Sequence, residues 1–274
     1  MDHNVYIPKL AKIIEIKEEV GGSRPIKSFR THFINKNDFS HRCGQSAMIS
    51  VLGKGESMIS ISSSPLVKDY LQFSILKMGR VTTALHEMQV QDVIGIRGPY
   101  GNGFPIEEWK GKNLVFIGGG IGLAPIWSVL NTALGKREDY GDLMLIYGAR
   151  TSKDLVFNDE LKELKKKITV FLSVDVEEEG WKEFVGFVPQ NVTDKKPSPK
   201  NSISVTCGPP IMIKFVIKAL KDLGFEDEQI YTTVENKMKC GIGKCGRCNI
   251  GKHYVCKDGP VYSWAQLKNL PQEY

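Results

Sequence analysis

Residues 240–256 read Cys-Gly-Ile-Gly-Lys-Cys-Gly-Arg-Cys-Asn-Ile-Gly-Lys-His-Tyr-Val-Cys and contain four of the six cysteines of this 274-residue chain. The four are Cys240, Cys245, Cys248 and Cys256, with the spacing C-x4-C-x2-C-x7-C. This spacing begins with the run typical of plant-type [2Fe–2S] sites. The glycines between the cysteines carry no Cβ, so the backbone can pass close to a cluster and adopt positive φ. The stretch therefore predicts a [2Fe–2S] cluster bound by these four thiolates.

Two other uses of the cysteines fit less well. A four-cysteine zinc site usually has two C-x2-C pairs, whereas only Cys245 and Cys248 form such a pair here. Disulfides are disfavoured because the N-terminus does not resemble a signal peptide, and cytosolic thiols stay reduced. Cys43 and Cys207 each stand alone, and we expect them to be small, half-buried side chains and not metal ligands.

Length and composition predict a globular chain with at least two domains, since 41% of its residues are hydrophobic. No apolar run reaches the about 18 residues that a membrane-spanning helix needs, and we expect a cytoplasmic protein. The net charge is +6, and residues 231–274 contain seven Lys or Arg against three Asp or Glu. These cations can balance an anionic cluster or attract an acidic partner. Nucleic acid is not expected, because no basic motif interleaved with aromatic residues is present.

The chain up to residue 108 has the pattern of an antiparallel β-barrel. Short runs rich in β-branched and aromatic residues, such as Phe29–Ile34, Ser46–Val51 and Leu71–Leu76, are separated by turn residues. Gly21-Gly22 and Gly53-Lys54-Gly55 mark two of the turns. No long helix is expected before residue 105.

From residue 109 strands and helices alternate, which predicts a doubly wound parallel sheet. The expected strands are Asn113–Ile117, Leu143–Tyr147, Ile168–Val174, Ser202–Thr206 and Gln229–Val234, and the expected helices include Leu155–Lys166 and Ile211–Leu223.

Two glycine-containing turns follow strands of this sheet, and each opens a helix. The first, residues 118–125, contains Gly120 and Gly122, and the second is Cys207-Gly208-Pro209-Pro210. A glycine-rich turn alone is a weak signal, and Pro125 replaces the third glycine of the usual dinucleotide fingerprint. Ligands of open α/β sheets bind at the carboxyl ends of the strands, where both turns lie. Together they predict one nucleotide-binding crevice.

With these motifs, the chain resembles the ferredoxin–NADP reductase superfamily over nearly its whole length, in the version with a C-terminal [2Fe–2S] extension. Residues 59–65, Ile-Ser-Ile-Ser-Ser-Ser-Pro, are similar to the flavin-facing strand. Gly79-Arg80-Val81-Thr82-Thr83 is similar to the loop and helix start that receive the flavin pyrophosphate, and Arg97-Gly98-Pro99-Tyr100-Gly101 to the turn that closes the barrel. Met238-Lys239-Cys240-Gly241 completes these matching stretches. Similar groups are the sulfhydrogenase gamma subunits, the dihydroorotate dehydrogenase electron-transfer subunits and the small subunits of NADH-dependent ferredoxin:NADP oxidoreductases.

The resemblance implies sites for FAD and for NAD(P)H. The residues implied for FAD are Ile59, Ser60, Ile61, Ser62, Gly79, Arg80, Val81, Thr82 and Thr83, and those for the nicotinamide coenzyme are Gly120, Gly122, Arg150, Cys207, Gly208 and Pro209. Hydroxyls and helix-start amides can bind flavin atoms and phosphate. Many relatives have an arginine where this chain has Ser57, so we expect Arg80 to supply that charge, and FMN stays open beside FAD. Arg150 follows the second α/β strand, but the sequence does not decide between NAD and NADP.

The resemblance also implies an electron-transfer flavoprotein, in which hydride moves between nicotinamide and flavin and single electrons move between flavin and cluster. The cofactors perform this chemistry, so no catalytic side chain is expected. The expected domains are a flavin-binding barrel (1–108), an NAD(P)-binding α/β domain (109–229) and a cluster domain (230–274). A cationic terminal cluster module fits an exit to other redox subunits carrying iron–sulfur clusters, as in a hydrogenase, a transhydrogenase or a bifurcating enzyme. A free-standing ferredoxin–NAD(P) reductase and a zinc-binding adaptor subunit without redox activity are the alternatives.

Overall fold

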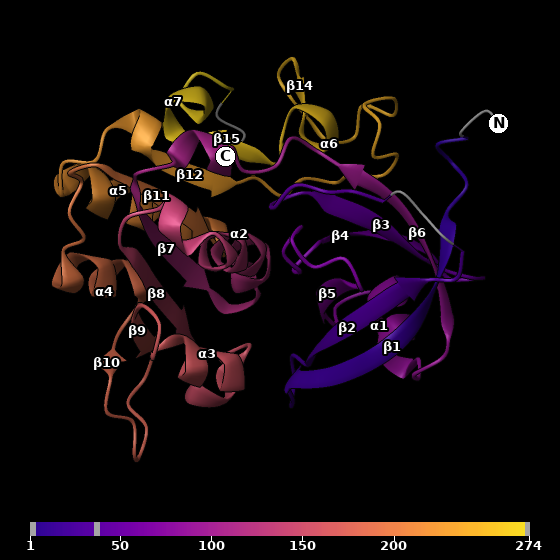
Figure 1. The fold of residues 1–274 in the computed structure, drawn as a ribbon, viewed down its shortest axis with the longest axis horizontal. Coiled ribbons are helices and arrows are strands. Elements are labelled where there is room, and N and C mark those ends of the chain that lie inside the picture. Colours follow the sequence, from indigo (N-terminus) through magenta and orange to yellow (C-terminus); the bar gives the residue numbers. More distant parts are fainter. Residues whose placement is uncertain (1–3, 36–38, 272–274) are drawn as a thin grey trace.

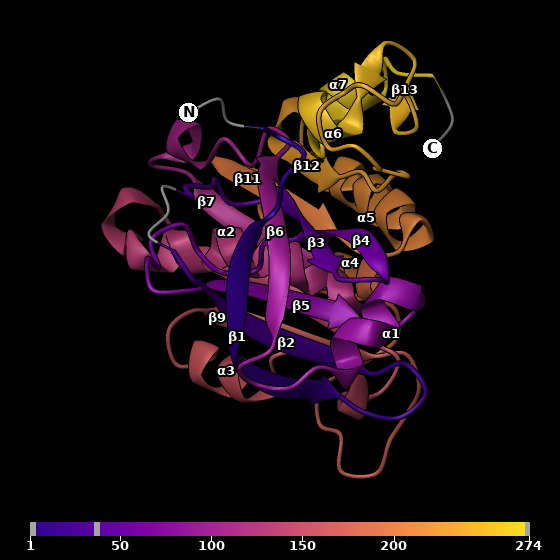
Figure 2. The same ribbon diagram turned by 90° about the vertical axis from the view of Figure 1, so that its right-hand side faces the viewer.

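The computed structural model describes residues 4–35 and 39–271. Two β-sheet bodies lie side by side, and the C-terminal segment, yellow in Figures 1 and 2, runs along one end of both. Within the described part of the chain, no helix is long and apolar enough to cross a bilayer.

The N-terminal body is the expected antiparallel barrel. Its strands are β1 (Lys9–Val20), β2 (Ile26–Phe33), β3 (Ser46–Val51), β4 (Gly55–Ser60), β5 (Leu71–Leu76) and β6 (Val93–Tyr100). They pair in the order β4-β3-β6-β1-β2-β5, and a bridge between Ile61 and Phe73 connects the chain beyond β4 to β5. Phe29, Ile49 and Phe73 fill the interior, and α1 (Arg80–Glu87) adds Leu85 to this core. The barrel prediction is confirmed.

The stretch Arg97–Gly101, expected to form a turn, instead continues β6 as far as Tyr100. Along β3 and β6, Met48 pairs with Arg97 but Ser46 pairs with Tyr100, so β6 contains one extra residue. Gly98 accommodates this bulge with φ 139°, a conformation that L side chains rarely adopt. The strand thereby extends beyond the barrel toward the C-terminal segment.

The second body is a seven-stranded sheet with helices on both faces (Figure 1). Its strands are β7 (Asn113–Gly119), β8 (Leu143–Ala149), β9 (Thr169–Val174), β10 (Phe184–Val185), β11 (Ser202–Cys207), β12 (Ile230–Thr233) and β15 (Val261–Ser263), in the order β10-β9-β8-β7-β11-β12-β15. Alternate β7 side chains face opposite layers: Leu114 and Phe116 pack with α2 (Leu123–Gly135), whereas Val115 and Ile117 pack with α4 (Val188–Lys195) and α5 (Pro210–Asp222). The doubly wound architecture is confirmed.

The helix expected over Leu155–Lys166 is shorter than predicted and spans Asn158–Leu164 (α3). The residues before it, Leu155 to Phe157, are buried in the core. Phe157 has a left-handed φ of 61° and stacks on Trp127 with ring centroids 4.7 Å apart. The apolar run therefore fills the core and does not form a first helical turn.

The sheet also departs from the prediction of a wholly parallel arrangement. Beyond the cysteine loop come the hairpin β13 (Asn249–Ile250) and β14 (His253–Tyr254) and the short helix α6 (Val255–Asp258). The chain then returns as β15, antiparallel to β12, and continues into α7 (Trp264–Leu267). Residues 230–274 thus add two strands to the α/β sheet: β12, which was predicted, and β15, which was not. A strand of only three residues leaves no recognisable sequence pattern.

Candidate functional site

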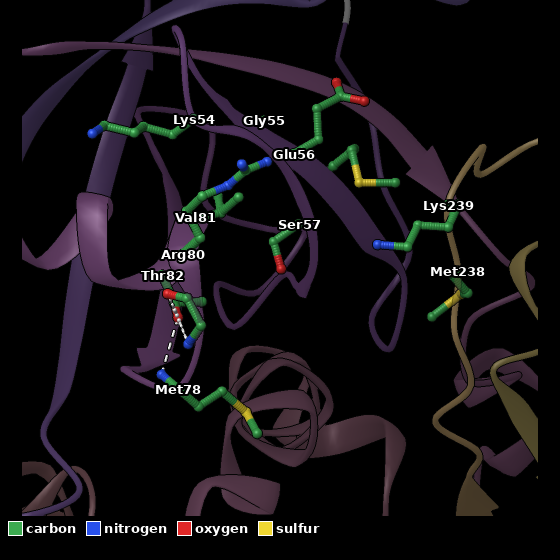
Figure 3. A pocket seen from close by; sticks show the side chains of 12 residues that line it. Lys54, Gly55, Glu56, Ser57, Met78, Arg80, Val81, Thr82, Met238 and Lys239 are labelled. Carbon is green, nitrogen blue, oxygen red and sulfur yellow. Dashed lines mark hydrogen bonds between the residues drawn. The ribbon is translucent and has the colours of Figure 1, made fainter.

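A pocket of about 620 Å³ opens between the barrel and the C-terminal segment (Figure 3). Its lining comes from β3, β4 and the turn before β4, from the start of α1, and from the tail: Met48, Lys54, Gly55, Glu56, Ser57, Met78, Gly79, Arg80, Val81, Thr82, Met238 and Lys239. The structure therefore brings four of the residues implied for FAD, Gly79 to Thr82, together in one pocket. Met238 and Lys239, which also line it, lie immediately before Cys240.

The pocket has the charge needed to bind a polyanion. Arg80 and Lys239 approach it from opposite walls in Figure 3, and Lys54 adds a third cation. Among the described residues, no carboxylate oxygen lies within 4 Å of any of these three cations. Ser57 and Arg80 line the same pocket, which is compatible with Arg80 supplying the positive charge that Ser57 lacks.

The hydroxyl of Thr82 stabilises the loop at the start of α1. Its Oγ1 accepts hydrogen bonds from the N–H groups of Met78 and Gly79, at 3.0 and 2.9 Å, and donates to the Gly79 carbonyl. These bonds hold the backbone of residues 78–79 in place at the pocket wall. Thr83 is half-buried in α1 and does not belong to the lining.

The four residues of the flavin-facing strand do not line this pocket. Ile59 and Ser60 are half-buried at the end of β4, whereas Ile61 and Ser62 are fully buried. Ser62 Oγ donates to the Gln72 carbonyl at 3.0 Å, so this hydroxyl already has a partner inside the barrel. The sequence pattern did not indicate which side chains point inward, because the chain leaves β4 here and crosses to β5.

The two glycine-containing turns meet at the centre of the α/β sheet. They follow the neighbouring strands β7 and β11, where the strand order reverses, and such switch points are where open α/β sheets bind ligands. A Cβ atom at Gly122 would lie 2.5 Å from the Cys207 carbonyl oxygen and 2.6 Å from Gly208 Cα. Gly120, with φ 53°, faces open space instead. Gly122 therefore permits the contact between the turns, and Pro209 packs close by, next to Gly119.

Arg150 and Cys207 occupy different surroundings near these turns. Arg150 is exposed beyond β8, and its carbonyl accepts a hydrogen bond from the N–H of Asp175. Burial raises the pKa of the Asp175 carboxyl, an effect that the positive charge of Arg150 opposes.

Cys207 is buried, accepts a hydrogen bond from Thr233 Oγ1 at 2.8 Å, and has its pKa raised to about 12 by burial. Burial raises the pKa of Cys43 to about 12 as well, so both isolated cysteines stay thiols.

The cysteine loop presents backbone N–H groups to its sulfur atoms. Cys240 Sγ accepts from the N–H groups of Ile242, Lys244 and Cys245 at 3.3–3.5 Å. Cys256 Sγ accepts from the N–H of Gly243 at 3.2 Å. The glycines of the loop all have positive φ: Gly241, Gly243, Gly246 and Gly251. A loop of this kind can wrap an anionic cluster and donate hydrogen bonds to its sulfurs.

The surroundings of the cysteine loop shift the pKa values of Cys240 and Cys256 in opposite directions. Burial disfavours the thiolate of Cys240, but the surrounding N–H groups and the adjacent Cys245 thiol lower its pKa to about 6. Burial and the neighbouring Cys248 thiol raise the pKa of Cys256 to about 12. Among the described residues, no three His, Cys, Asp or Glu side chains converge on a single metal position.

The Glu56 carboxylate at the pocket wall is paired with Arg97, and we expect this pair to make stability pH-dependent. Hydrogen bonds from Arg97 lower the pKa of Glu56 below its ordinary 4.5, against the opposing effect of burial. Because the folded-state pKa is the lower one, the stabilisation is present above pH 4.5 and is lost as the pH falls through the folded value. Urea unfolding from pH 3 to 7 should show the difference in unfolding free energy between wild type and Glu56→Gln narrowing below pH 4.5. A difference independent of pH would contradict this account.

Comparison with known proteins identifies two parts of the chain. Residues 116–218 match the oxidoreductase NAD-binding domain family, and residues 235–268 match the iron–sulfur cluster binding domain of dihydroorotate dehydrogenase B.

Relatives are similar over most of the chain. Sulfhydrogenase 1 subunit gamma of Pyrococcus furiosus is 41% identical, covering 83% of this chain and 81% of the relative. The probable dihydroorotate dehydrogenase B (NAD(+)), electron transfer subunit, of the same organism is 33% identical, covering 93% and 92%. A solved structure of NADH-dependent reduced ferredoxin–NADP oxidoreductase superposes with a TM-score of 0.74 at 22% identity, covering 99% of this chain and 91% of the other, and shows the same fold. The chain thus belongs to the family that includes the sulfhydrogenase gamma subunits and the dihydroorotate dehydrogenase B electron transfer subunits, with an iron–sulfur cluster binding domain at residues 235–268.

Proposed function

We propose that this chain is an electron-transfer flavoprotein subunit that passes electrons between NAD(P)H, FAD and a [2Fe–2S] cluster within a larger redox complex. One observation carries the proposal. The pocket beside α1 is lined both by the barrel and by Met238 and Lys239, the two residues before Cys240, so the proposed flavin site lies next to the start of the cysteine loop. The family membership supports it, because the sulfhydrogenase and dihydroorotate dehydrogenase relatives are named as subunits.

The residues of this chain bind and orient the cofactors. The start of α1 and the pocket cations would hold the FAD phosphates, the two glycine turns would receive the coenzyme pyrophosphate, and the four cysteines would hold the cluster. When bound, these groups supply two-electron exchange with nicotinamide and one-electron exchange with the cluster. The proposed parts, 1–108, 109–229 and 230–274, then carry one cofactor each, while the third also adds β12 and β15 to the sheet.

The surface around the cysteine loop fits an exit to another protein. Cys245 is exposed, and so are Lys244, Arg247 and Lys252 nearby in the chain. Such a cationic surface attracts an acidic partner, and the proposed partners are redox subunits that carry iron–sulfur clusters. We place the protein in the cytoplasm, where reducing conditions keep cysteines free of disulfides.

The visible spectrum of protein purified from its native source tests this proposal. Bound flavin gives a yellow colour and an oxidised cluster adds brown absorption at longer wavelengths, whereas a zinc-binding adaptor would be colourless because zinc is d¹⁰. Size-exclusion chromatography of the same material, with identification of copurifying subunits, separates a complex from a free-standing reductase. A colourless protein with stoichiometric zinc would establish the adaptor instead.

Arg150 is proposed to contribute to the choice between NADPH and NADH. If its guanidinium meets the 2′-phosphate of NADPH, Arg150→Ala should lower the ratio of kcat/KM for NADPH to that for NADH. The expected loss is about 1–3 kcal/mol, the range for a charge-assisted hydrogen bond. Steady-state kinetics with both coenzymes measures it, with Lys153→Ala, an exposed cation of the same loop, as the matched control. An equal loss with both coenzymes would mean that Arg150 does not discriminate.

A further inference from the structure

Arg97 lies buried between the pocket and the cysteine loop, with 7% of its surface exposed. Its Nε and Nη2 donate to the two carboxylate oxygens of Glu56, at 2.8 and 2.6 Å. Its Nη1 donates to the Tyr100 hydroxyl and to the Cys240 carbonyl, both at 2.8 Å. One guanidinium therefore connects strand β4, strand β6 and the first of the four cysteines.

This geometry depends on the shape of an arginine side chain. A guanidinium presents a planar fork of donors that can bind a carboxylate with two parallel hydrogen bonds and still reach a third group. A lysine ammonium at this position would retain the charge but could not reproduce the fork. Because a buried charge is costly without partners, Arg97 needs Glu56 to remain in this position.

The end of β6 and the residues after it contact the chain on both sides of the cysteine loop. The Tyr100 ring packs on Gly241, where a Cβ atom would come within 2.7 Å of the ring. Asn102 Nδ2 donates to the Val261 carbonyl at 2.7 Å, and the N–H of Val261 donates to Asn102 Oδ1 at 3.1 Å. Residues 97–102 thus contact the chain both at Cys240 and shortly after Cys256, and fix the loop from both sides.

The Arg97–Glu56 pair also borders the pocket. Glu56 belongs to the pocket lining, together with Met238 and Lys239. The charge of Arg97 next to the Cys240 backbone is therefore compensated by a carboxylate on the wall of the proposed FAD site.

We propose that Arg97 is a positioning residue for electron transfer: it holds the Cys240 end of the cluster loop at the rim of the flavin pocket, and its pairing with Glu56 sets the net charge beside the cluster. This inference rests on the proposed function. In the step concerned, one electron leaves the reduced flavin and enters the oxidised cluster, no heavy-atom bond forms or breaks, and any proton that the flavin loses passes to solvent. The reducing equivalents come from NAD(P)H.

Two variants of the whole chain, loaded with FAD and cluster, test the proposal. Glu56→Gln removes the compensating charge with little change of shape, and Arg97→Lys keeps the charge but loses the fork. Glu15→Gln is the matched control, because Glu15 pairs with Arg30 at 2.7 Å on the exposed surface of the barrel. FAD content, the cluster signal in electron paramagnetic resonance, the cluster reduction potential and stopped-flow rates are compared in all three and in wild type.

The two variants should differ in a defined way. In Glu56→Gln the uncompensated guanidinium favours the reduced, more negative cluster, so the reduction potential of the cluster should rise. In Arg97→Lys the electron transfer from flavin to cluster should be slower than in the control, because the ammonium cannot hold Glu56 and the Cys240 carbonyl together as the guanidinium fork does. The Glu15→Gln control should match wild type throughout, in FAD content, in cluster potential and in the rate of flavin reduction by NAD(P)H.

The proposal is overturned if the cluster potential of Glu56→Gln equals that of the Glu15→Gln control and Arg97→Lys transfers electrons at the wild-type rate. If Arg97→Lys does not retain its cluster, the test rests on Glu56→Gln: a cluster reduction potential equal to that of the Glu15→Gln control then overturns the proposal. Wild-type protein that binds neither flavin nor cluster would instead refute the proposed function itself.

Discussion

The Cys248→Ser variant should lose or strongly perturb the cluster, while its flavin is still reduced by the preferred coenzyme at close to the wild-type rate. A hydroxyl is a poorer ligand for iron than a soft thiolate, and iron–sulfur centres depend on thiolate ligation. Cys248 is 1% exposed and packs in the small core of the C-terminal segment, with Val234 and Cys256. The barrel and sheet cores do not include it, so both larger bodies should stay folded.

Stopped-flow mixing with NADH and with NADPH, followed by transfer to the physiological one-electron partner, measures both halves of this result. Flavin bleaching should persist, and delivery to the partner should fall to background. Cys43→Ser is the control, since it makes the same exchange at a buried cysteine of another core. If folded protein that lacks the cluster signal delivers electrons undiminished, the cluster is not the exit.

The second large effect is expected at Gly122. In Gly122→Val the new Cβ atom would fall 2.5 Å from the Cys207 carbonyl oxygen and 2.6 Å from the Gly208 backbone nitrogen, so the two turns must separate. Backbone atoms cannot give way as the end of a flexible side chain can. We expect the KM for the coenzyme to rise by about tenfold or more, which corresponds to about 1.4 kcal/mol of lost binding.

Steady-state kinetics and circular dichroism on the same samples measure this effect and show that the variant is folded. Gly21→Val is the matched control, because a Cβ atom there meets only the Glu18 carboxylate, at 3.2 Å. Unchanged coenzyme binding in folded Gly122→Val would show that the turns do not form one coenzyme site.

The sequence was sufficient to predict those parts of the fold and of the site that depend on neighbouring residues in the chain. Alternation of apolar residues and turn residues predicted both sheets, and the cysteine spacing predicted the loop whose N–H groups surround Cys240. Residues brought together across long stretches of chain gave no such signal. Arg97 and Glu56 are 41 positions apart, and Arg97 and Cys240 are 143 apart, so no pattern could predict their contact.

Other departures come from tertiary packing that outweighs local preference. The apolar residues 155–157 indicated a helix, but burial of Phe157 against Trp127 holds them in the core before the helix begins. Ser62 also has a partner that the sequence did not indicate, because its hydroxyl donates to the Gln72 carbonyl. A run of serines does not reveal which acceptor each hydroxyl bonds, because a backbone carbonyl and a cofactor oxygen accept the same hydrogen bond.

The antiparallel pairing of β15 with β12 has a consequence for the solubility of the protein. An uncovered strand edge offers unpaired N–H and C=O groups to other chains, and short terminal strands are one way in which proteins limit such aggregation. Here the segment that follows the cysteines covers β12, and the two outermost strands of the sheet are only two and three residues long. A chain shortened after Thr233 to obtain a cluster-free reductase would therefore expose β12 and tend to self-associate. Variants that remove a cysteine ligand and retain the whole tail avoid that problem.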